Sequence, residues 1–176
     1  MSGQAGRYQR SAGGMAGAMI VLVLLILGWV GFRALTSREP ANPVETIDYH
    51  REVPVAKKTA TFDLVVPPRL PTGWRATTVD FTDAPDQHWH LGVLTDRGRY
   101  VGLEQGDQPV IVLVHKYVDD AAKRGKPVEV GGSSWSTYTD SGGDTALVRR
   151  SGKTTTLVVG HEVPRSDLIS YTSSLR

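Results

Sequence analysis

The chain has 176 residues, of which 40% are hydrophobic and 22% are charged, and this length provides for one modest folded domain beside a tail and an apolar segment. Three of the 20 basic residues precede Ala34 and all 18 acidic residues follow it, so 17 basic residues face 18 acidic ones there and the net charge is −1. Such a domain lacks the basic face that nucleic-acid binding requires, and the absence of cysteine excludes disulfides, cysteine nucleophiles and thiolate metal ligands.

The first element in chain order is an apolar segment. Residues 12–32 read AGGMAGAMIVLVLLILGWVGF, which is 21 positions without a charge. At a rise of ~1.5 Å per residue, a helix of this length spans a hydrocarbon core ~30 Å thick. No cleavage site of the A-x-A type follows, which argues against a removed signal peptide. We therefore predict an uncleaved, single-pass transmembrane helix over residues 12–34 that holds the protein in the cell membrane.

The number of basic residues is equal on the two sides of this segment, so the count does not determine its orientation. Arg7 and Arg10 precede it, and Arg33 and Arg38 follow it. The short basic tail has the form of the leader of an export signal, and long C-terminal domains cross membranes largely regardless of their charge. We therefore expect residues 1–11 to form a cytoplasmic tail and the C-terminal domain to be extracytoplasmic.

Residues 35–60 are predicted to form a linker between the membrane and the domain. The stretch from Thr36 to Ala60 contains three prolines and many charges, and it shows no sustained periodicity. Its later part, from Ile47, either continues as a spacer or packs on the domain, which we place at residues 61–176.

Short strands are predicted in the first half of the domain. The run TFDLVVP at residues 61–67 predicts a strand that prolines end. A second strand follows a Pro-Thr-Gly turn and runs through residues 74–80, and a third covers HWHLGVLT at residues 88–95. The turn at residues 96–98 places glycine where positive φ is easiest, so residues 99–105 are expected to return as the hairpin partner.

Residues 107–124 carry signals for both a helix and a strand. Their β-branched residues favour a strand, whereas Asp107 suits a helix N-cap and Pro109 suits a first turn. Five apolar residues also fall on one helical face, namely Val110, Ile111, Val114, Val118 and Ala121. We favour a helix that ends near the Lys-Arg-Gly sequence at residues 123–125.

The rest of the chain is predicted to form a meander and a final helix. Strands are expected in KPVEV, SSWSTYT, TALVRR and TTTLVVGHEV, and the short links between them favour antiparallel pairing. Pro164, Ser166 and Asp167 open a helix whose apolar side carries Leu168, Ile169, Thr172 and Leu175. The predicted fold class is α+β, a curved antiparallel β-sheet with helices packed on one face.

Five short motifs together resemble a known family. In order they are RLPTGWRAT, WHLGVLTDRGRYVGLEQ, VEVGGSSWSTY, LVRRSGKTTTLVVG and a final helix that ends in SLR. This order resembles actinobacterial membrane-anchored proteins collected as domain of unknown function 4245, and the resemblance covers nearly the whole chain. It implies topology and lineage, but it implies no activity and no functional residue. The β-branched stretch at residues 110–118 departs from the family's pattern by its length.

The pattern His88-Trp89-His90 raises the question of a metal site. On a strand, residues two apart share a face, so both imidazoles point the same way, as in zinc and iron sites. The candidates for the further ligands that such a site needs are His115, His161, Asp80 and Glu104. The alternative is that Trp89, Leu91 and Val93 face the core while the two histidines face solvent at a strand edge. We favour this alternative and expect no metal and no cofactor.

No catalytic constellation is recognisable in the sequence. GGSSWS at residues 131–136 is not a G-x-S-x-G nucleophile elbow, and the chain has no phosphate-binding glycine motif. DSGGD at residues 140–144 lacks the further oxygen ligands of a calcium site and is predicted to be a hairpin turn. Trp74, Trp89 and Trp135 lie in predicted strands, where they either fill the core or line a binding surface.

The predicted function is that of an extracytoplasmic binding or interaction module of the cell envelope, not an enzyme. It would hold a cell-envelope ligand or a membrane protein partner on an uncovered sheet face. One alternative is a metal-binding protein or metal-dependent enzyme that uses His88 and His90. Another is an accessory subunit of a membrane complex, with the membrane span as its interaction surface.

Overall fold

The computed structural model describes residue 17 and residues 19–29 and 45–176. Residues 19–29 are helical. Within the described ranges, no helix combines the length and the apolar character needed to cross a membrane. The rest of the transmembrane helix predicted over residues 12–34, and the cytoplasmic tail predicted before it, lie outside the described residues. Val44–Arg176 forms a compact unit.

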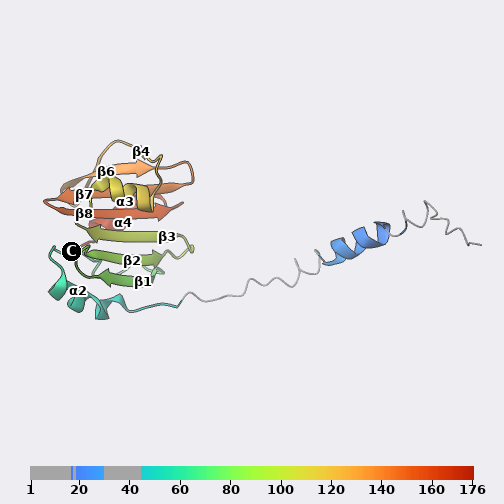
Figure 1. Cartoon of the computed structure of the whole chain (residues 1–176), viewed down its shortest axis with the longest axis horizontal. Helices are drawn as coiled ribbons and strands as arrows, with labels where there is room; N and C mark the ends of the chain where they lie inside the picture. Colours follow the sequence, from blue (N-terminus) through green and yellow to red (C-terminus); the bar gives the residue numbers. More distant parts are fainter. Residues whose placement is uncertain (1–16, 18, 30–44) are drawn as a thin grey trace, which may run out of the picture. The chain divides into compact units, whose positions relative to one another are not determined.

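The centre of this unit is an eight-stranded antiparallel sheet (Figure 1). The order of the strands across it is β1-β2-β3-β8-β7-β6-β4, and β5 pairs with β6 outside this path. The strands are β1 (Arg75–Thr82), β2 (His88–Leu94), β3 (Tyr100–Gly106), β4 (Lys123–Arg124), β5 (Val128–Val130), β6 (Ser133–Thr139), β7 (Asp144–Ser151) and β8 (Thr154–His161). The predicted antiparallel α+β fold is therefore confirmed.

The sheet consists of two meanders joined by one long-range pairing. β1, β2 and β3 follow one another along the chain, and so do β5, β6, β7 and β8, because short turns favour pairing with the next strand. The turn between β2 and β3 is closed by a hydrogen bond of 2.8 Å from the Thr95 amide to the Arg99 carbonyl, and Gly98 adopts φ 72°, as predicted. The meanders meet where β3 pairs with β8, from Val101 opposite Gly160 to Gly106 opposite Thr155.

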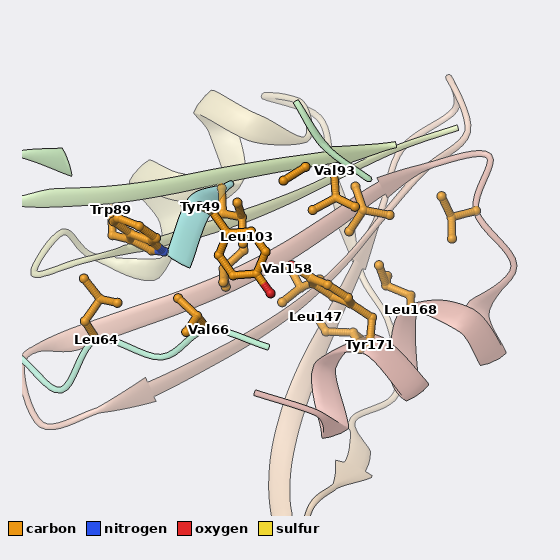
Figure 2. Close-up of a cluster of buried hydrophobic side chains, with 14 of the residues drawn as sticks. Tyr49, Leu64, Val66, Trp89, Val93, Leu103, Leu147, Val158, Leu168 and Tyr171 are labelled. Atoms are coloured by element: carbon orange, nitrogen blue, oxygen red, sulfur yellow. The ribbon is translucent and has the colours of Figure 1, made fainter. Parts of the chain in front are cut away.

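The main core lies on one face of the sheet, beneath α4 (Arg165–Ser173). Figure 2 shows Leu103, Leu147 and Val158 pointing from the strands toward Leu168 and Tyr171 of α4. The side chains predicted to face this core, Trp89, Leu91 and Val93, are fully buried. Their burial follows from the two-residue period of a strand.

A second, smaller core lies on the opposite face, beneath α3 (Val110–Tyr117). It consists of Leu113 and Val114 of α3 with Ala146, Val148, Leu157 and Val159 of the sheet. Neighbouring residues of a strand point to opposite faces, so Leu147 belongs to the main core and Val148 to the second. The prediction that the helices cover one face is therefore wrong, since α3 and α4 pack on opposite faces.

The helix predicted within residues 107–124 is confirmed, but its details differ. It is shorter than predicted, has Pro109 rather than Asp107 at its N-cap, and is followed by β4 where the stop signal was read. The predicted apolar face is correct for Val110, Val114 and Val118, which pack in the second core, but wrong for Ile111, which is 53% exposed. The packed residues are Leu113 and Val114, flanked by Val110 and Tyr117, at the spacing i, i+3, i+4 and i+7.

The compact unit includes residues that the sequence analysis assigned to the linker. Residues 45–60 carry η1 (Tyr49–Arg51) and α2 (Val53–Thr59). The Ile47 amide donates to the Ala76 carbonyl at 3.0 Å, and the buried Tyr49 hydroxyl donates to the Pro67 carbonyl at 2.7 Å. The part from Ile47 onward therefore packs on the sheet.

The strand predicted at residues 61–67 does not form. Its buried residues, Leu64 and Val66, do pack in the main core. However, its backbone forms hydrogen bonds with a side chain of the sheet rather than with the backbone of a neighbouring strand. Gln105 accepts from the Val65 amide at 3.0 Å and donates to the Asp63 carbonyl at 2.9 Å. The segment is therefore a loop, and Gln105 satisfies two of its backbone polar groups.

Candidate functional site

The candidate site lies on the α3 face of the sheet, where β2 and β3 run side by side. His90 and Glu104 are direct cross-strand partners, and His88 lies two residues before His90. These residues alternate with the buried Trp89, Leu91 and Leu103, so they point away from the main core. β2 lies between β1 and β3, and the prediction that the two histidines face solvent at a strand edge is therefore wrong.

Glu104 is held between the two imidazoles. His88 Nε2 lies 2.7 Å from Glu104 Oε2, and His90 Nδ1 lies 2.6 Å from Glu104 Oε1. The Glu104 side chain is 1% exposed, whereas His88 and His90 are 13% and 21% exposed. A buried carboxylate is stable only when both oxygens are paired, and the two histidines provide that pairing.

Tyr117, at the end of α3, covers His88. The two rings stack with centroids 5.8 Å apart and planes 5° from parallel. The Tyr117 hydroxyl lies 3.0 Å from His88 Nε2, and the Lys116 ammonium lies 4.8 Å from the centroid of the Tyr117 ring. The last turn of α3 therefore contributes directly to the cluster around Glu104.

Tyr100 approaches the cluster from the other side, and paired glycines make room for its ring. Gly92 and Gly102 are opposite each other on β2 and β3. A Cβ on Gly92 would lie 3.2 Å from Tyr100 Cε2, and a Cβ on Gly102 would lie 3.1 Å from the Tyr100 hydroxyl. The phenol therefore lies against backbone, at a distance that a side chain on either glycine would obstruct.

The burial and charges of the cluster shift the pKa values of its acidic groups. Burial opposes ionisation of Glu104, but the hydrogen bonds and attraction from His88 and His90 outweigh it and hold the pKa of Glu104 below its ordinary 4.5. Burial, with the nearby charge of Glu104, raises the pKa of Tyr100 to about 12. The same two causes raise the pKa of Tyr117.

The ionised state of Glu104 determines which imidazole nitrogens carry protons. A carboxylate only accepts hydrogen bonds, so His88 Nε2 and His90 Nδ1 must both be donors. In the neutral ring, His90 then keeps a lone pair on Nε2, and no hydrogen bond to Nε2 occurs within the described residues. His90 is thus prepared to accept a hydrogen bond from a ligand.

The structure brings together only some of the predicted metal ligands. His115 is paired with Asp120 on the surface, and His161 is bonded to Asp144 at 2.9 Å at the end of β8. Asp80 is the cross-strand partner of His90 on β1 but is exposed. In the part of the chain that the structure describes, no group of three or more His, Asp or Glu side chains is arranged to hold a metal ion. His88 Nε2 and His90 Nδ1 are both engaged in hydrogen bonds with the Glu104 oxygens.

Sequence reasoning named Glu104 as a possible carboxylate but missed Tyr100 and Tyr117. Tyr100 and Glu104 are four residues apart on one strand, so the period of two places them on one face. That signal was available once Tyr100 was placed in the strand. Tyr117 reaches the cluster only because α3 packs on this face, and no local pattern encodes that contact.

Comparison with known protein families identifies a match. The model of a family described as a protein of unknown function, DUF4245, matches residues 7–170, which is well over half of the chain. Among curated proteins, none matches the chain. The match therefore includes the first four short motifs and the start of α4, and the chain belongs to the DUF4245 family.

Proposed function

We propose that the protein is a binding module of the cell envelope, tethered to the membrane, whose ligand contacts the α3 face of the sheet over β1, β2 and β3. The observation that carries this proposal is the Glu104 cluster. It places an imidazole backed by a buried carboxylate on a stretch of sheet that α3 leaves open (Figure 1). α3 packs against β7 and β8, and its last residue reaches only as far as His88.

The chemistry of this surface indicates the kind of ligand. Thr78, Asp80 and Thr82 of β1 are exposed beside His90, and Tyr100 is 37% exposed. His90 Nε2 and the Asp80 carboxylate both accept hydrogen bonds, and the threonine hydroxyls accept or donate. A ligand that presents hydroxyl or amino groups matches this set. Such a ligand is either a glycan of the envelope or a polar segment of a partner protein.

The tether is proposed to be the apolar segment at residues 12–34. Its charge-free run of 21 residues has the length of a membrane span. Its large apolar side chains from Met19 to Trp29 are at least 48% exposed, which is unfavourable for such groups in water. A reporter that is active only outside the cytoplasm, fused after Arg176 of the full chain, should be active. Activity only of a cytoplasmic reporter at the same position would contradict this orientation.

The binding surface is tested by crosslinking. A photoreactive amino acid at Thr78, next to His90, should give a specific adduct in the cells that produce the protein, identified by mass spectrometry. The same amino acid at Ser170, an exposed position on the opposite face, serves as the control. His90→Ala in the Thr78 background should abolish the adduct without loss of the thermal unfolding transition. Equal adducts from both positions, or an adduct that persists in His90→Ala, would overturn the proposal.

A further inference from the structure

A cavity of about 230 Å³ lies on the face of the sheet opposite the Glu104 cluster. Its walls come from the ends of β7 and β8, from β5 and β6, and from the last turn of α4 with the residues that follow it. The volume is below that of a drug-sized pocket and suits a small metabolite or several waters. None of its lining residues belongs to the surface described above.

One wall of the cavity carries a guanidinium in a fixed position. Arg149 Nη1 donates to the Ser133 hydroxyl at 2.8 Å, and the guanidinium lies 5.7 Å from the centroid of the Trp135 ring. Stacking on an aromatic face and a hydrogen bond together restrict the side chain. A guanidinium has five N–H donors, so most of those on Arg149 remain available.

A second guanidinium stands at the end of α4. Arg176 Nη1 donates to the Ser173 carbonyl at 3.0 Å and to the Leu175 carbonyl at 2.8 Å. Its backbone exchanges two hydrogen bonds with Val66, which fixes the position of the residue. Within the described part of the chain, neither Arg149 nor Arg176 forms an ion pair, and the lining contains one acidic residue, Asp63.

The floor of the cavity adds neutral hydrogen-bonding groups. Thr154 and Thr156 of β8 and Ser151 of β7, each of which carries a hydroxyl, are among the lining residues. Trp135 also lines it, and the buried indole N–H of Trp135 has no acceptor among the described residues. A buried donor without a partner costs free energy unless water or a ligand supplies an acceptor. Hydroxyls and guanidiniums around a small volume recognise oxygen-rich anions.

We propose that this cavity binds a small organic oxyanion, held between Arg149 and Arg176 with its remaining oxygens on the threonine and serine hydroxyls. The shared chemistry is that of a phosphate or a carboxylate, because the planar fork of a guanidinium matches both. The side chains of the lining carry two guanidiniums, Arg149 and Arg176, and one carboxylate, Asp63, so their net charge favours an anion over a neutral ligand. The site is separate from the proposed binding surface, and neither depends on the other.

The test measures binding to the full-length chain in mild detergent by calorimetry and by tryptophan fluorescence. The probes are inorganic phosphate, the hydroxydicarboxylate tartrate, and glycerol as a neutral comparison. Phosphate or tartrate should bind and raise the unfolding temperature, whereas glycerol at the same concentration should not. Phosphate alone would identify a phosphate site, and tartrate alone would identify a carboxylate site. Failure of both anions to bind would overturn the proposal.

Matched arginine variants locate the binding. Arg149→Met should weaken binding at least about tenfold, because it removes charged hydrogen bonds. Arg124→Met is the control: Arg124 on β4 also bonds a serine hydroxyl, Ser136 at 2.9 Å, but on the other face of the sheet. Binding should be unchanged in this control. Should Arg149→Met unfold, Arg176→Met provides the same comparison. Equal weakening in Arg124→Met would mean nonspecific attraction and would overturn the proposal.

Discussion

Glu104 is the residue whose charge most directly stabilises the sheet on the α3 face. Replacing it by glutamine removes the anion between His88 and His90 and leaves their buried N–H donors poorly matched. Loss of hydrogen bonds to a buried charged group costs roughly 1.5–3 kcal/mol of unfolding free energy, so we expect Glu104→Gln to lower stability by about that amount. Urea unfolding at neutral pH measures it. Glu129→Gln, an exposed glutamate on β5, should leave the midpoint unchanged.

The pKa of Glu104 also predicts how stability depends on pH. The folded pKa lies below the ordinary 4.5, so the folded chain releases this proton more readily than the unfolded chain. The stabilisation from Glu104 is therefore complete above the unfolded pKa and is lost as the pH falls through the lower folded value. Acid unfolding of wild type should be steeper below the unfolded pKa than that of Glu104→Gln. Parallel curves for the two proteins would contradict this assignment.

Gly102 is required because the Tyr100 ring and Val159 lie over it. A Cβ there would meet the Tyr100 hydroxyl at 3.1 Å and Val159 Cγ1 at 3.2 Å. Gly102→Ala should therefore cost roughly 1–3 kcal/mol, the range for overpacking. In a Tyr100→Ala background part of the obstruction is gone, and the cost should be smaller. A double-mutant cycle from thermal unfolding checks this, and strictly additive costs would show that the ring is not the obstacle.

Among the elements, α3 is the one whose packing differs most from its sequence pattern. Leu113 is fully buried against the sheet, whereas Ile111, two residues earlier, is 53% exposed. Leu113→Ala should lower the unfolding free energy by roughly 2–5 kcal/mol, and Ile111→Ala should change it by less than about 0.5 kcal/mol. Chemical denaturation of both variants measures the difference. Similar losses in both would mean that α3 packs through the other face.

Elements with strong local signals could be predicted from the sequence, and elements that depend on distant contacts could not. The hairpin around Gly98 and the strand at His88–Leu94 follow from a turn residue and an alternating pattern. The stretch at residues 61–67 has the composition of a strand, yet Gln105 satisfies its backbone from forty residues away. The packed face of α3 differs from the predicted one at Ile111 and Leu113, because both residues are apolar and hydrophobicity alone does not choose between them.

The candidate site could be predicted only in part for the same reason. The spacing of His88 and His90 places them on one face, and Glu104 is one of the two carboxylates that the sequence offers as partners. Glu104 lies between the two histidines because of the register in which β2 pairs with β3. This register cannot be read from the sequence alone. The contribution of Tyr117 depends on α3 packing on this face rather than on the other.

At the scale of the whole molecule, four tyrosines that are partly or fully shielded from solvent contribute to the response to alkali. Burial is the main cause that raises the pKa of four residues above 10: Tyr49, Tyr100, Tyr117 and Tyr171. A raised folded pKa means that the stabilisation is present below the unfolded value of 10 and is lost as the pH rises through the folded values, which for Tyr100 is about 12. We expect tyrosinate absorbance to lag in native protein relative to protein in denaturant. Identical titrations would contradict the burial of these phenols.

The pairing of β3 with β8 has a consequence for how the chain acquires its fold. Each meander contains contacts between neighbours in sequence and can form quickly, but the two halves join only when residues 154–161 reach β3. Until then β3 has a free edge whose unpaired backbone N–H and C=O groups, between Val101 and Gly106, can pair with another chain. During synthesis the chain therefore passes through a stage in which the edge of β3 is unpaired. Aggregation at this stage is avoided when β8 pairs with β3 quickly.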